Sequence, residues 1–386
     1  MMVRDLRVAG KTGMLNVILL FAFVAGLWVV NVSYYYQRRE YLMAMANHFL
    51  ATAKRNEIPE VLMNISSVQN ATPFPASNVT IKKAEEKMIN ELEELLEDVN
   101  ATFKNYQVIY KMSKSSNESF CEGADAVVYV MTMADEGSTL RRQAMREVVF
   151  NATNLPANMT IRHRFVMGKF PARADYQQIL LNETREYDDI LFYNVDEHYR
   201  ENYIKWHTMH AWHMRHCPNV KHFIKMDDDT VADFDRTFKW IERKFDGLLE
   251  GKEKYFVCHR MRGYSPVRDR KNERWYIPVE EFGESHWPDY CFGYFVLTNN
   301  DTITDIMTAQ QNINLVHMDD CFLTGIVRRA TEADVYDFYG VRSGISRPRC
   351  SKDRELPYMM TLTNAKTAES VRSKLSTIKK RNCKGM

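Results

Sequence analysis

Three consecutive aspartates, Asp227, Asp228 and Asp229, follow the short apolar segment 222–226. Adjacent carboxylates repel one another, and a divalent cation is a common means of neutralising them in proteins. Oxygen-rich sites suit Mg²⁺ or Mn²⁺, which often bridge protein carboxylates and substrate phosphates. The triplet therefore predicts a site for a metal-bound diphosphate, and an acidic turn in water is the alternative.

The spacing within the triplet distinguishes its members. On an extended segment, side chains two residues apart point the same way. We expect Asp229 to bind the metal and Asp227 to contact the metal or a ribose, with Asp228 in a sugar-contact or structural role. An EF-hand loop is excluded, because Ala232 stands where that loop needs Gly and Phe238 where it needs Glu.

The elements around the triplet alternate between strands and helices. The sequence predicts apolar strands at 126–131, 164–167, 189–193, 221–226, 255–258 and 294–297, and a helix over 198–216. This alternation indicates an α/β protein with a mainly parallel sheet. In an open α/β sheet, ligands bind at the carboxyl ends of strands, which is where the triplet lies.

Composition and cysteine usage exclude several classes of protein. The chain has 386 residues, enough for one large domain with accessory segments, and its 52 Lys and Arg against 50 Asp and Glu predict no nucleic-acid partner. None of the seven cysteines forms a CxxC pair, which gives no support to a zinc ribbon or a thioredoxin-like protein. In an oxidising compartment they could form up to three disulfides, with the connectivity open.

The apolar segment 14–32 predicts a single membrane-spanning helix, because its length matches a bilayer. Arg4, Arg7 and Lys11 precede it and favour a cytoplasmic N-terminus. A cleaved signal peptide is the alternative, but the apolar run is longer than usual and no A-x-A-like site follows. We expect a cytoplasmic tail at 1–13, an uncleaved signal anchor at 14–32 and a lumenal remainder.

Nine Asn-x-Ser/Thr sequons lie beyond this segment, which is typical of a glycoprotein of the secretory pathway. The candidate glycosylation sites are Asn64, Asn70, Asn78, Asn100, Asn117, Asn151, Asn158, Asn182 and Asn300.

Residues 33–120 predict a lumenal stem, followed by a body at 121–350 and a C-terminal tail at 351–386. Within the stem, segment 82–99 has a helical apolar pattern. The apolar face of this helix carries Met88, Ile89, Leu92, Leu95, Leu96 and Val99. The helix either forms a short coiled coil, which would give a homodimer, or packs on the body.

Six blocks, in unbroken order over about residues 121–340, resemble glycosyltransferase family 31, the β-1,3-galactosyltransferase-like Golgi enzymes. The blocks are RRQAMR at 141–146, FVMG at 165–168, YDDIL at 187–191 with the stretch 196–212, the stretch from CP at 217 to KMDDD ending at 229, WPDYCFG at 287–293 and MDDCFLTG at 318–325. The resemblance implies a GT-A fold, a single-pass type II Golgi membrane topology, a UDP-sugar donor, Mn²⁺ (or Mg²⁺) and inversion at the anomeric carbon.

An inverting transfer needs a base that takes the proton of the acceptor hydroxyl. Asp319 and Asp320 align with the family's Glu-Asp pair, so the resemblance implies Asp320 as the catalytic base beside Asp319. An Asp pair that caps the helix beginning near Phe322 is the alternative. No His follows His317, although many metal-dependent GT-A enzymes use a late His as a further ligand. A water, a diphosphate oxygen or another protein group is therefore expected in its place.

Seven further residues are candidates for contacts with the substrates. Arg141, Arg142 and Arg146 follow the first strand and can clamp a diphosphate, or can form the solvated basic face of a helix. An acceptor-side loop is predicted at Trp287, Asp289, Tyr290 and Gly293, with core packing as the alternative. Core positions are expected for Trp206, Met209 and Trp212, and a structural role for Lys205.

The expected function is that of a hexosyltransferase that moves a sugar, galactose being the family's commonest, in β-1,3 linkage to a glycan acceptor on a glycoprotein or glycolipid. N-acetylglucosaminyl transfer is the alternative within the family. A non-catalytic chaperone or glycan-binding relative is the alternative from another class.

Overall fold

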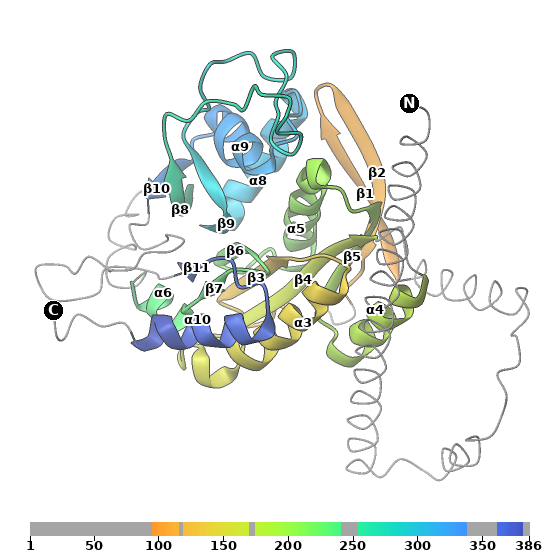
Figure 1. Ribbon diagram of the computed structural model, residues 1–386, viewed down its shortest axis with the longest axis vertical. Helices are drawn as coiled ribbons and strands as arrows, with labels where there is room; N and C mark the ends of the chain where they lie inside the picture. Colours follow the sequence, from red (N-terminus) through yellow and green to blue (C-terminus); the bar gives the residue numbers. More distant parts are fainter. Residues whose placement is uncertain (1–94, 116–118, 170–173, 241–253, 338–360, 381–386) are drawn as a thin grey trace, which may run out of the picture. The chain divides into compact units, whose positions relative to one another are not determined.

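The computed structural model describes residues 95–115, 119–169, 174–240, 254–337 and 361–380 (Figure 1). All of them belong to one compact unit, Val79–Met386. The predicted anchor at 14–32 and the sequons at Asn64, Asn70, Asn78 and Asn117 lie outside the described residues. In the described part of the chain, no helix is both long and apolar enough to cross a membrane.

A nine-stranded mixed sheet in the order β1-β2-β5-β4-β3-β6-β9-β8-β10 organises this unit. Its centre, from β5 to β6, is parallel, whereas β9 runs antiparallel to β6 and β8. From β5 to the edge of the sheet, the strands are, in order, β5 (Ile190–Asp196), β4 (Ile161–Lys169), β3 (Ala126–Met131), β6 (His222–Asp227), β9 (Tyr290–Thr298), β8 (Tyr255–Met261) and β10 (Asp334–Asp337). The six strands predicted from apolar runs are therefore confirmed, in a sheet that is mixed at its β9 side.

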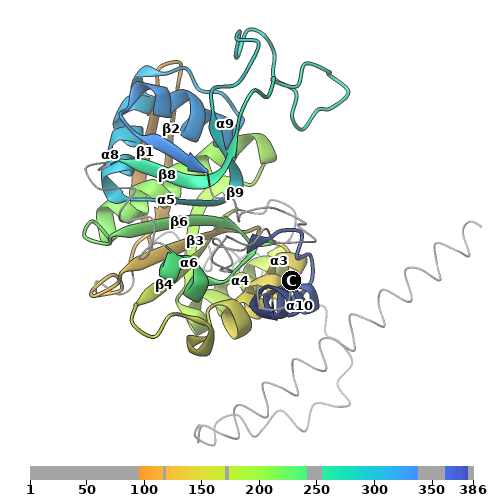
Figure 2. The ribbon, with the colours of Figure 1, turned by 90° about the vertical axis from the view of Figure 1, so that its left-hand side faces the viewer.

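Alternating side chains of the sheet enter two hydrophobic cores, one on each face. Val127 and Tyr129 of β3 belong to the first core, and Val128 and Val130 to the second. All of β3 is buried, as expected for a strand covered on both faces. Figures 1 and 2 show α5 (Asn202–His216) and α8 (Asn300–Ala309) on one side of the central strands, with α3 (Glu136–Ala144) and α10 (Ala368–Lys380) on the other.

Helix α5 is the main helix of the first core. Trp206, Met209 and Trp212 are almost completely buried, which confirms their predicted core positions. Burial lowers the pKa of His207 to about 4 and that of His210 to about 3, so both rings are neutral at physiological pH. Further described elements are α4 (Ala174–Tyr187), β7 (Val231–Ala232), α6 (Phe234–Trp240), α9 (Asp319–Cys321) and β11 (Thr361–Leu362).

The predicted stem contains part of the folded sheet. Residues 96–113 form a hairpin of β1 (Leu96–Phe103) and β2 (Tyr106–Ser113), and β2 pairs with β5. Tyr110 of β2 bonds His207 Nδ1 of α5 at 2.8 Å. The helix predicted over 82–99 is therefore wrong from Leu96 onward, because residues 96–103 pair antiparallel with β2. Its first part lies outside the described residues.

The predicted C-terminal tail is also part of the body. β11 pairs antiparallel with β7, the short strand that follows the aspartate triplet. Three apolar residues of α10, Val371, Leu375 and Ile378, are buried in the second core. Residues 361–380 are therefore part of the body, through a small second sheet with β7 and through the second core, and a boundary at 351 is wrong for them.

Four of the seven cysteines form disulfides, Cys121–Cys217 and Cys258–Cys291. Cys321 is a free, buried thiol, and Cys350 and Cys383 lie outside the described residues. Cys217 directly follows α5, and Cys291 lies on β9 two residues before the predicted site residue Gly293.

Five of the predicted glycosylation sites fall on described residues. Asn100, Asn151, Asn158 and Asn182 are exposed. Asn300 instead donates its side-chain Nδ2 to Pro218 O at 2.7 Å, and a glycan there would disrupt this bond.

We predict that Leu375→Ala destabilises the protein by about 2 to 5 kcal/mol, because it opens a cavity under α10. Chemical denaturation of the full chain measures this loss. Ser376→Ala, on the exposed side of the same helix, is the control and should change stability by less than about 0.5 kcal/mol. Equal stability of both variants and wild type would mean that α10 does not contribute to the body.

Candidate functional site

The aspartate triplet lies at the carboxyl end of β6. Asp227 is the last residue of that strand, and Met131 at the end of β3 is its partner across the ladder. The backbone N–H of Asp228 donates to Met131 O at 3.0 Å, and that of Thr230 donates to Asp227 O at 3.0 Å, which turns the chain into β7. The triplet thus occupies the edge where ligands bind in open α/β sheets.

The three carboxylates differ in environment. Asp228 is buried, and its Oδ2 accepts from Thr132 Oγ1 at 2.8 Å and from Arg141 Nη2 at 3.0 Å. Asp227 and Asp229 are half-buried and flank it. The turn after β6 thus buries Asp228 in a structural role and leaves Asp227 and Asp229 on either side of it partly exposed.

The charge on Asp229 is poorly compensated. Burial, then the adjacent carboxylates of Asp227 and Asp228, raise the pKa of Asp229, and Arg141 and Lys225 offset only part of this. A divalent cation beside Asp227 and Asp229 would relieve the repulsion, so these oxygen ligands fit Mn²⁺ or Mg²⁺. Among the described residues no group of three or more His, Cys, Asp or Glu could by itself hold a metal. The remaining ligands would come from water, a bound diphosphate or another protein group.

Lys225 connects the triplet to the next strand. Its Nζ contacts Asp227 Oδ1 at 2.5 Å and donates to the carbonyl of Gly293 on β9. The ammonium also lies 5.2 Å from the centre of the Trp206 ring. Lys225 is almost fully buried, and a buried cation must be paired in this way to be tolerated.

The second acidic group, Asp319 and Asp320, lies on α9 against the same lysine. Asp319 is buried and accepts from Trp206 Nε1 at 2.7 Å. Asp320 is half-buried; its Oδ2 accepts from Gly293 N at 3.3 Å and its Oδ1 from Cys321 N at 2.7 Å. Burial is the main cause that raises the pKa of both carboxyls, to about 7 for Asp319. Asp320 is the more open of the two, and its raised pKa makes it a stronger base than an ordinary aspartate.

Gly293 is a point of close approach between the two acidic groups. A Cβ at this position would lie 3.2 Å from Cβ of Asp320 and 3.6 Å from Lys225 Nζ. A side chain here would press on Asp320, so the glycine lets Asp320 lie close to the backbone of β9. Of the four residues predicted for the acceptor loop, Gly293 is the one that contacts Asp320 directly through a hydrogen bond.

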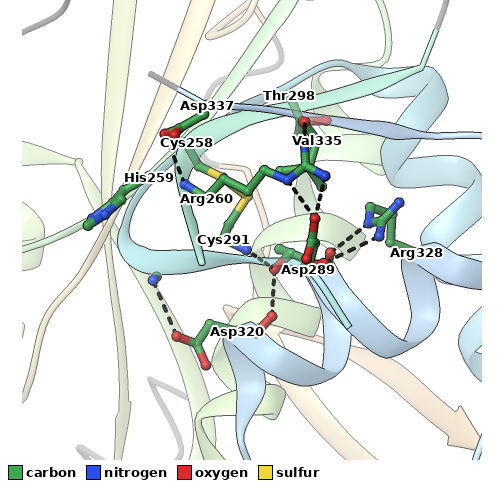
Figure 3. The surroundings of a disulfide bond; sticks show 12 residues. Cys258, His259, Arg260, Asp289, Cys291, Thr298, Asp320, Arg328, Val335 and Asp337 are labelled. Atoms are coloured by element: carbon green, nitrogen blue, oxygen red, sulfur yellow. Dashed lines mark hydrogen bonds and ion pairs between the residues drawn. A yellow bond between two sulfur atoms is a disulfide. The ribbon is translucent and has the colours of Figure 1, made fainter. Parts of the chain in front are cut away.

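The other three have structural contacts. Trp287 is buried and stacks on Phe282 with ring centres 4.5 Å apart. Asp289 forms an ion pair with Arg260 (Figure 3) and a second one with Arg262 at 3.4 Å. Tyr290 is buried against Cys321. The packing alternative therefore describes Trp287, Asp289 and Tyr290 better than direct acceptor contact.

Figure 3 shows how the Cys258–Cys291 disulfide holds this part of the site. It joins β8 to β9, and Arg260, two residues after Cys258, pairs with Asp289, two residues before Cys291. The start of β9 is thereby fixed from both sides, and with it the carbonyl and N–H of Gly293.

The three predicted donor-binding arginines separate into two groups. Arg141 is half-buried and pairs with Asp228, at the edge of the triplet. Arg142 is completely buried and forms a two-pronged ion pair with Glu183, while Arg146 pairs with Glu183 and Asp189. The prediction that Arg142 and Arg146 clamp the donor is wrong, because both guanidinium groups form ion pairs with carboxylates of the protein itself.

Three residues of the site had no predicted role there. Lys225 was part of the KMDDD block, and a lysine on a buried strand two residues before an acidic cluster is the signal that could have identified it. Trp206 was expected in the core, where it lies, but its N–H also binds Asp319. The third is Ala365, whose N–H donates to Asp229 O at 2.7 Å, and this contact depends on the return of the C-terminal chain. Lys205 has the predicted structural role, with Nζ bonded to Glu197 and to Thr132 O.

These features define an α/β protein whose mixed sheet carries two carboxylate groups joined through one buried lysine. The galactosyltransferase family model matches residues 140–338, about half of the chain and including both acidic groups. The chain belongs to this family, which confirms the resemblance to glycosyltransferase family 31.

Individual relatives match the same region. Human beta-1,3-galactosyltransferase 2 is 26% identical over 204 residues, covering 53% of this chain and 47% of the relative. Rat lactosylceramide 1,3-N-acetyl-beta-D-glucosaminyltransferase is 25% identical over 209 residues, with coverage of 53% and 54%. Mouse UDP-GlcNAc:betaGal beta-1,3-N-acetylglucosaminyltransferase 7 is 27% identical over 201 residues, with coverage of 51% and 49%. The match therefore spans about half the length of these relatives. Among solved structures, mouse xyloside xylosyltransferase 1 matches with a TM-score of 0.30 and 13% identity, covering 58% of this chain and 89% of its own.

We predict that Asp319→Asn changes the dependence of stability on pH. The pKa of Asp319 is raised from 3.8 to about 7 in the folded protein, so the folded state binds this proton more tightly than the unfolded state. The resulting stabilisation is complete below about pH 4 and is lost as the pH rises through about 7. Asparagine keeps an oxygen for the Trp206 N–H and carries no charge. The variant should therefore gain stability relative to wild type as the pH rises from about 4 to 8.

Thermal melts of both proteins across this pH range measure the effect. Asp235→Asn, which removes an exposed carboxylate, is the control and should follow wild type. A stability difference between Asp319→Asn and wild type that stays constant with pH would contradict the assigned ionisation.

Proposed function

We propose that the protein is a glycosyltransferase of the GT-A type that transfers a hexose from a UDP-sugar to a glycan acceptor. The transfer is Mn²⁺-dependent, inverts the anomeric carbon and forms a β-1,3 linkage. The observation that carries the proposal is the pairing of two acidic groups, a diphosphate-type site at Asp227–Asp229 and a candidate base at Asp320, held together by Lys225 and Gly293.

On the donor side, Asp227 and Asp229 are the residues that would hold the cation, and Asp228 with Arg141 fixes the turn that presents them. The bound cation would stabilise the negative charge that develops on the departing diphosphate. Arg141 lies beside this turn and supplies a further positive charge at the donor side.

On the acceptor side, Asp320 takes the proton of the acceptor hydroxyl. The hydroxyl oxygen forms a bond to the anomeric carbon of the donor sugar while the bond from that carbon to the diphosphate oxygen breaks. UDP leaves with the bonding electrons, and the proton remains on Asp320. Attack from the face opposite the leaving group inverts the anomeric carbon.

The names of the relatives support two donors, UDP-galactose and UDP-N-acetylglucosamine, and an acceptor that ends in a β-galactoside. Galactose is the donor sugar of the leading proposal. The apolar segment 14–32 and the sequons support a type II Golgi membrane protein whose acceptors are glycoproteins or glycolipids of the lumen.

The first test is a screen of UDP release from UDP-galactose, UDP-N-acetylglucosamine and other UDP-sugars, with lactose as acceptor and Mn²⁺ present, repeated with EDTA. We expect release from one donor, stimulated by lactose and abolished by EDTA. A folded protein that releases UDP from no donor and shows no thermal shift with UDP and Mn²⁺ would instead support the non-catalytic alternative.

We predict that UDP with Mn²⁺ raises the melting temperature and that Asp229→Asn abolishes the shift, because the variant loses a negatively charged metal ligand. Asp235→Asn serves as the control and should keep the full shift. Since the pKa of Asp229 is raised and the metal requires its carboxylate, the wild-type shift should also weaken as the pH falls. An undiminished shift in Asp229→Asn would remove this residue from the metal site.

We predict that Lys225→Met lowers kcat/KM by about 100-fold, because it removes the charge that positions Asp227 and Asp320 relative to each other. Initial rates with the donor identified in the screen measure the loss. The matched control is Lys221→Met, at an exposed lysine just before the same strand. A rate within a factor of about two of wild type would exclude the proposed role of Lys225.

A further inference from the structure

The segment 262–289, between β8 and β9, carries exposed aromatic residues that the site described above does not use. Figure 2 shows it as the long loop that extends away from the sheet. The segment is ordered by side chains that donate to backbone carbonyls: Arg268 donates to Ile277 O at 2.7 Å and to Phe282 O at 2.6 Å, and Arg200 to Glu273 O at 2.6 Å. Its aromatic residues are therefore held in place rather than free.

Trp275 is the largest of these exposed side chains, with 45% of its surface accessible. Its Nε1 donates to the hydroxyl of Tyr199 at 2.9 Å, and the backbone N–H of Trp275 donates to Asn272 O at 3.1 Å. The Arg274 guanidinium lies 3.9 Å from the centre of the Tyr199 ring and 5.7 Å from the centre of the Trp275 ring, so it is closer to the Tyr199 ring than to the indole. A large apolar ring is thus fixed by its polar atom while part of its surface faces solvent, an arrangement that suits binding.

The position of Trp275 relative to the candidate base follows from α5. Tyr199 begins the short helix that leads directly into α5, and Trp206 on α5 donates to Asp319 beside Asp320. Seven residues separate Tyr199 from Trp206, which corresponds to about 10 Å along a helix. Burial raises the pKa of the Tyr199 hydroxyl, and the nearby charges of Asp319 and Asp320 raise it further. The hydroxyl therefore lies within electrostatic range of the acidic pair.

We infer that Trp275, oriented by Tyr199, forms an acceptor subsite that stacks the sugar next to the one whose hydroxyl reacts. This inference rests on the proposed function. Two helical turns are too far for the indole to contact the reacting sugar at Asp320, but they suit the following sugar of a longer acceptor. The apolar face of a pyranose would pack on the indole, and its hydroxyl groups would remain in water. Trp287, which the sequence predicts for such a role, is buried against Phe282.

The test compares two acceptors, methyl β-galactoside and lactose, with the full chain. Trp275→Ala should raise the KM for lactose about tenfold, which is the loss of one aromatic stacking contact, and leave the KM for the donor unchanged. The KM for methyl β-galactoside should not change, because this acceptor has no second sugar. Trp275→Phe keeps an aromatic face and should recover most of the affinity for lactose. Tyr106→Ala, at an aromatic residue of similar exposure (43%) on β2, is the matched control.

A second readout does not depend on turnover. Saturation-transfer NMR of lactose without donor should show contacts at its glucose unit in wild type and lose them in Trp275→Ala. Unchanged contacts, an equal KM change for both acceptors, or no binding of lactose to wild type would each overturn the subsite. Lactose contacts that depend on Trp275, together with no UDP release from any donor, would retain a glycan-binding site and overturn the proposed transferase.

Discussion

The site depends on keeping five carboxylates close together at one end of the sheet, and Lys225 is the interaction that makes this tolerable. Two like charges about 4 Å apart repel by several kcal/mol near a protein surface, and burial increases that cost. Lys225 lies between the triplet and the acidic pair, bonded to Asp227 and to the carbonyl of Gly293. The same ammonium lies over Trp206, which binds Asp319. Lys225 therefore contacts the triplet directly and is linked to the acidic pair through Gly293 and Trp206.

This arrangement restricts the sheet around it. Lys225 reaches Gly293 because β6 and β9 are antiparallel neighbours, with Lys225 opposite Val296 and Met226 opposite Phe295. Continuing this register brings Gly293 beside the triplet, and the absence of a side chain there lets Asp320 approach. The Cys258–Cys291 disulfide and the Arg260–Asp289 ion pair then fix the start of β9. The change from parallel to antiparallel pairing at β9 is therefore part of the site.

The sequence predicted the central strands correctly because apolar runs are a local signal. Clustered charge is equally local, and it singled out the triplet and the pair, whose catalytic roles stay predictions. Prediction from the sequence failed where a residue's role depends on a distant partner. Arg142 and Arg146 look like anion-binding arginines until Glu183 and Asp189 are brought against them. Leu96 and Val99 fit a helical face as well as a strand face, and pairing with β2 decides between them.

Segments at both ends of the described chain illustrate the same point. The hairpin at 96–113 binds α5 through Tyr110, and residues 361–380 return so that Ala365 contacts Asp229. Neither segment has a motif, because each contributes backbone or packing contacts instead of chemistry. The family match at 140–338 likewise excludes both. These segments support the site without being part of its sequence signature.

The proposed donor and acceptor sides of the site differ in the structural element that carries them. The donor carboxylates follow a strand that is buried on both faces, so a substitution nearby would disturb the core as well as the ligand. The proposed acceptor side instead includes the loop 262–289, in which the side chains of Arg200 and Arg268 donate hydrogen bonds to backbone carbonyls. Because these contacts are made to backbone atoms, they do not depend on which side chains are exposed. The exposed residues of the loop, Trp275 among them, can therefore vary without loss of the loop's conformation. A fold of this kind can keep one donor geometry and change its acceptor through the loop alone.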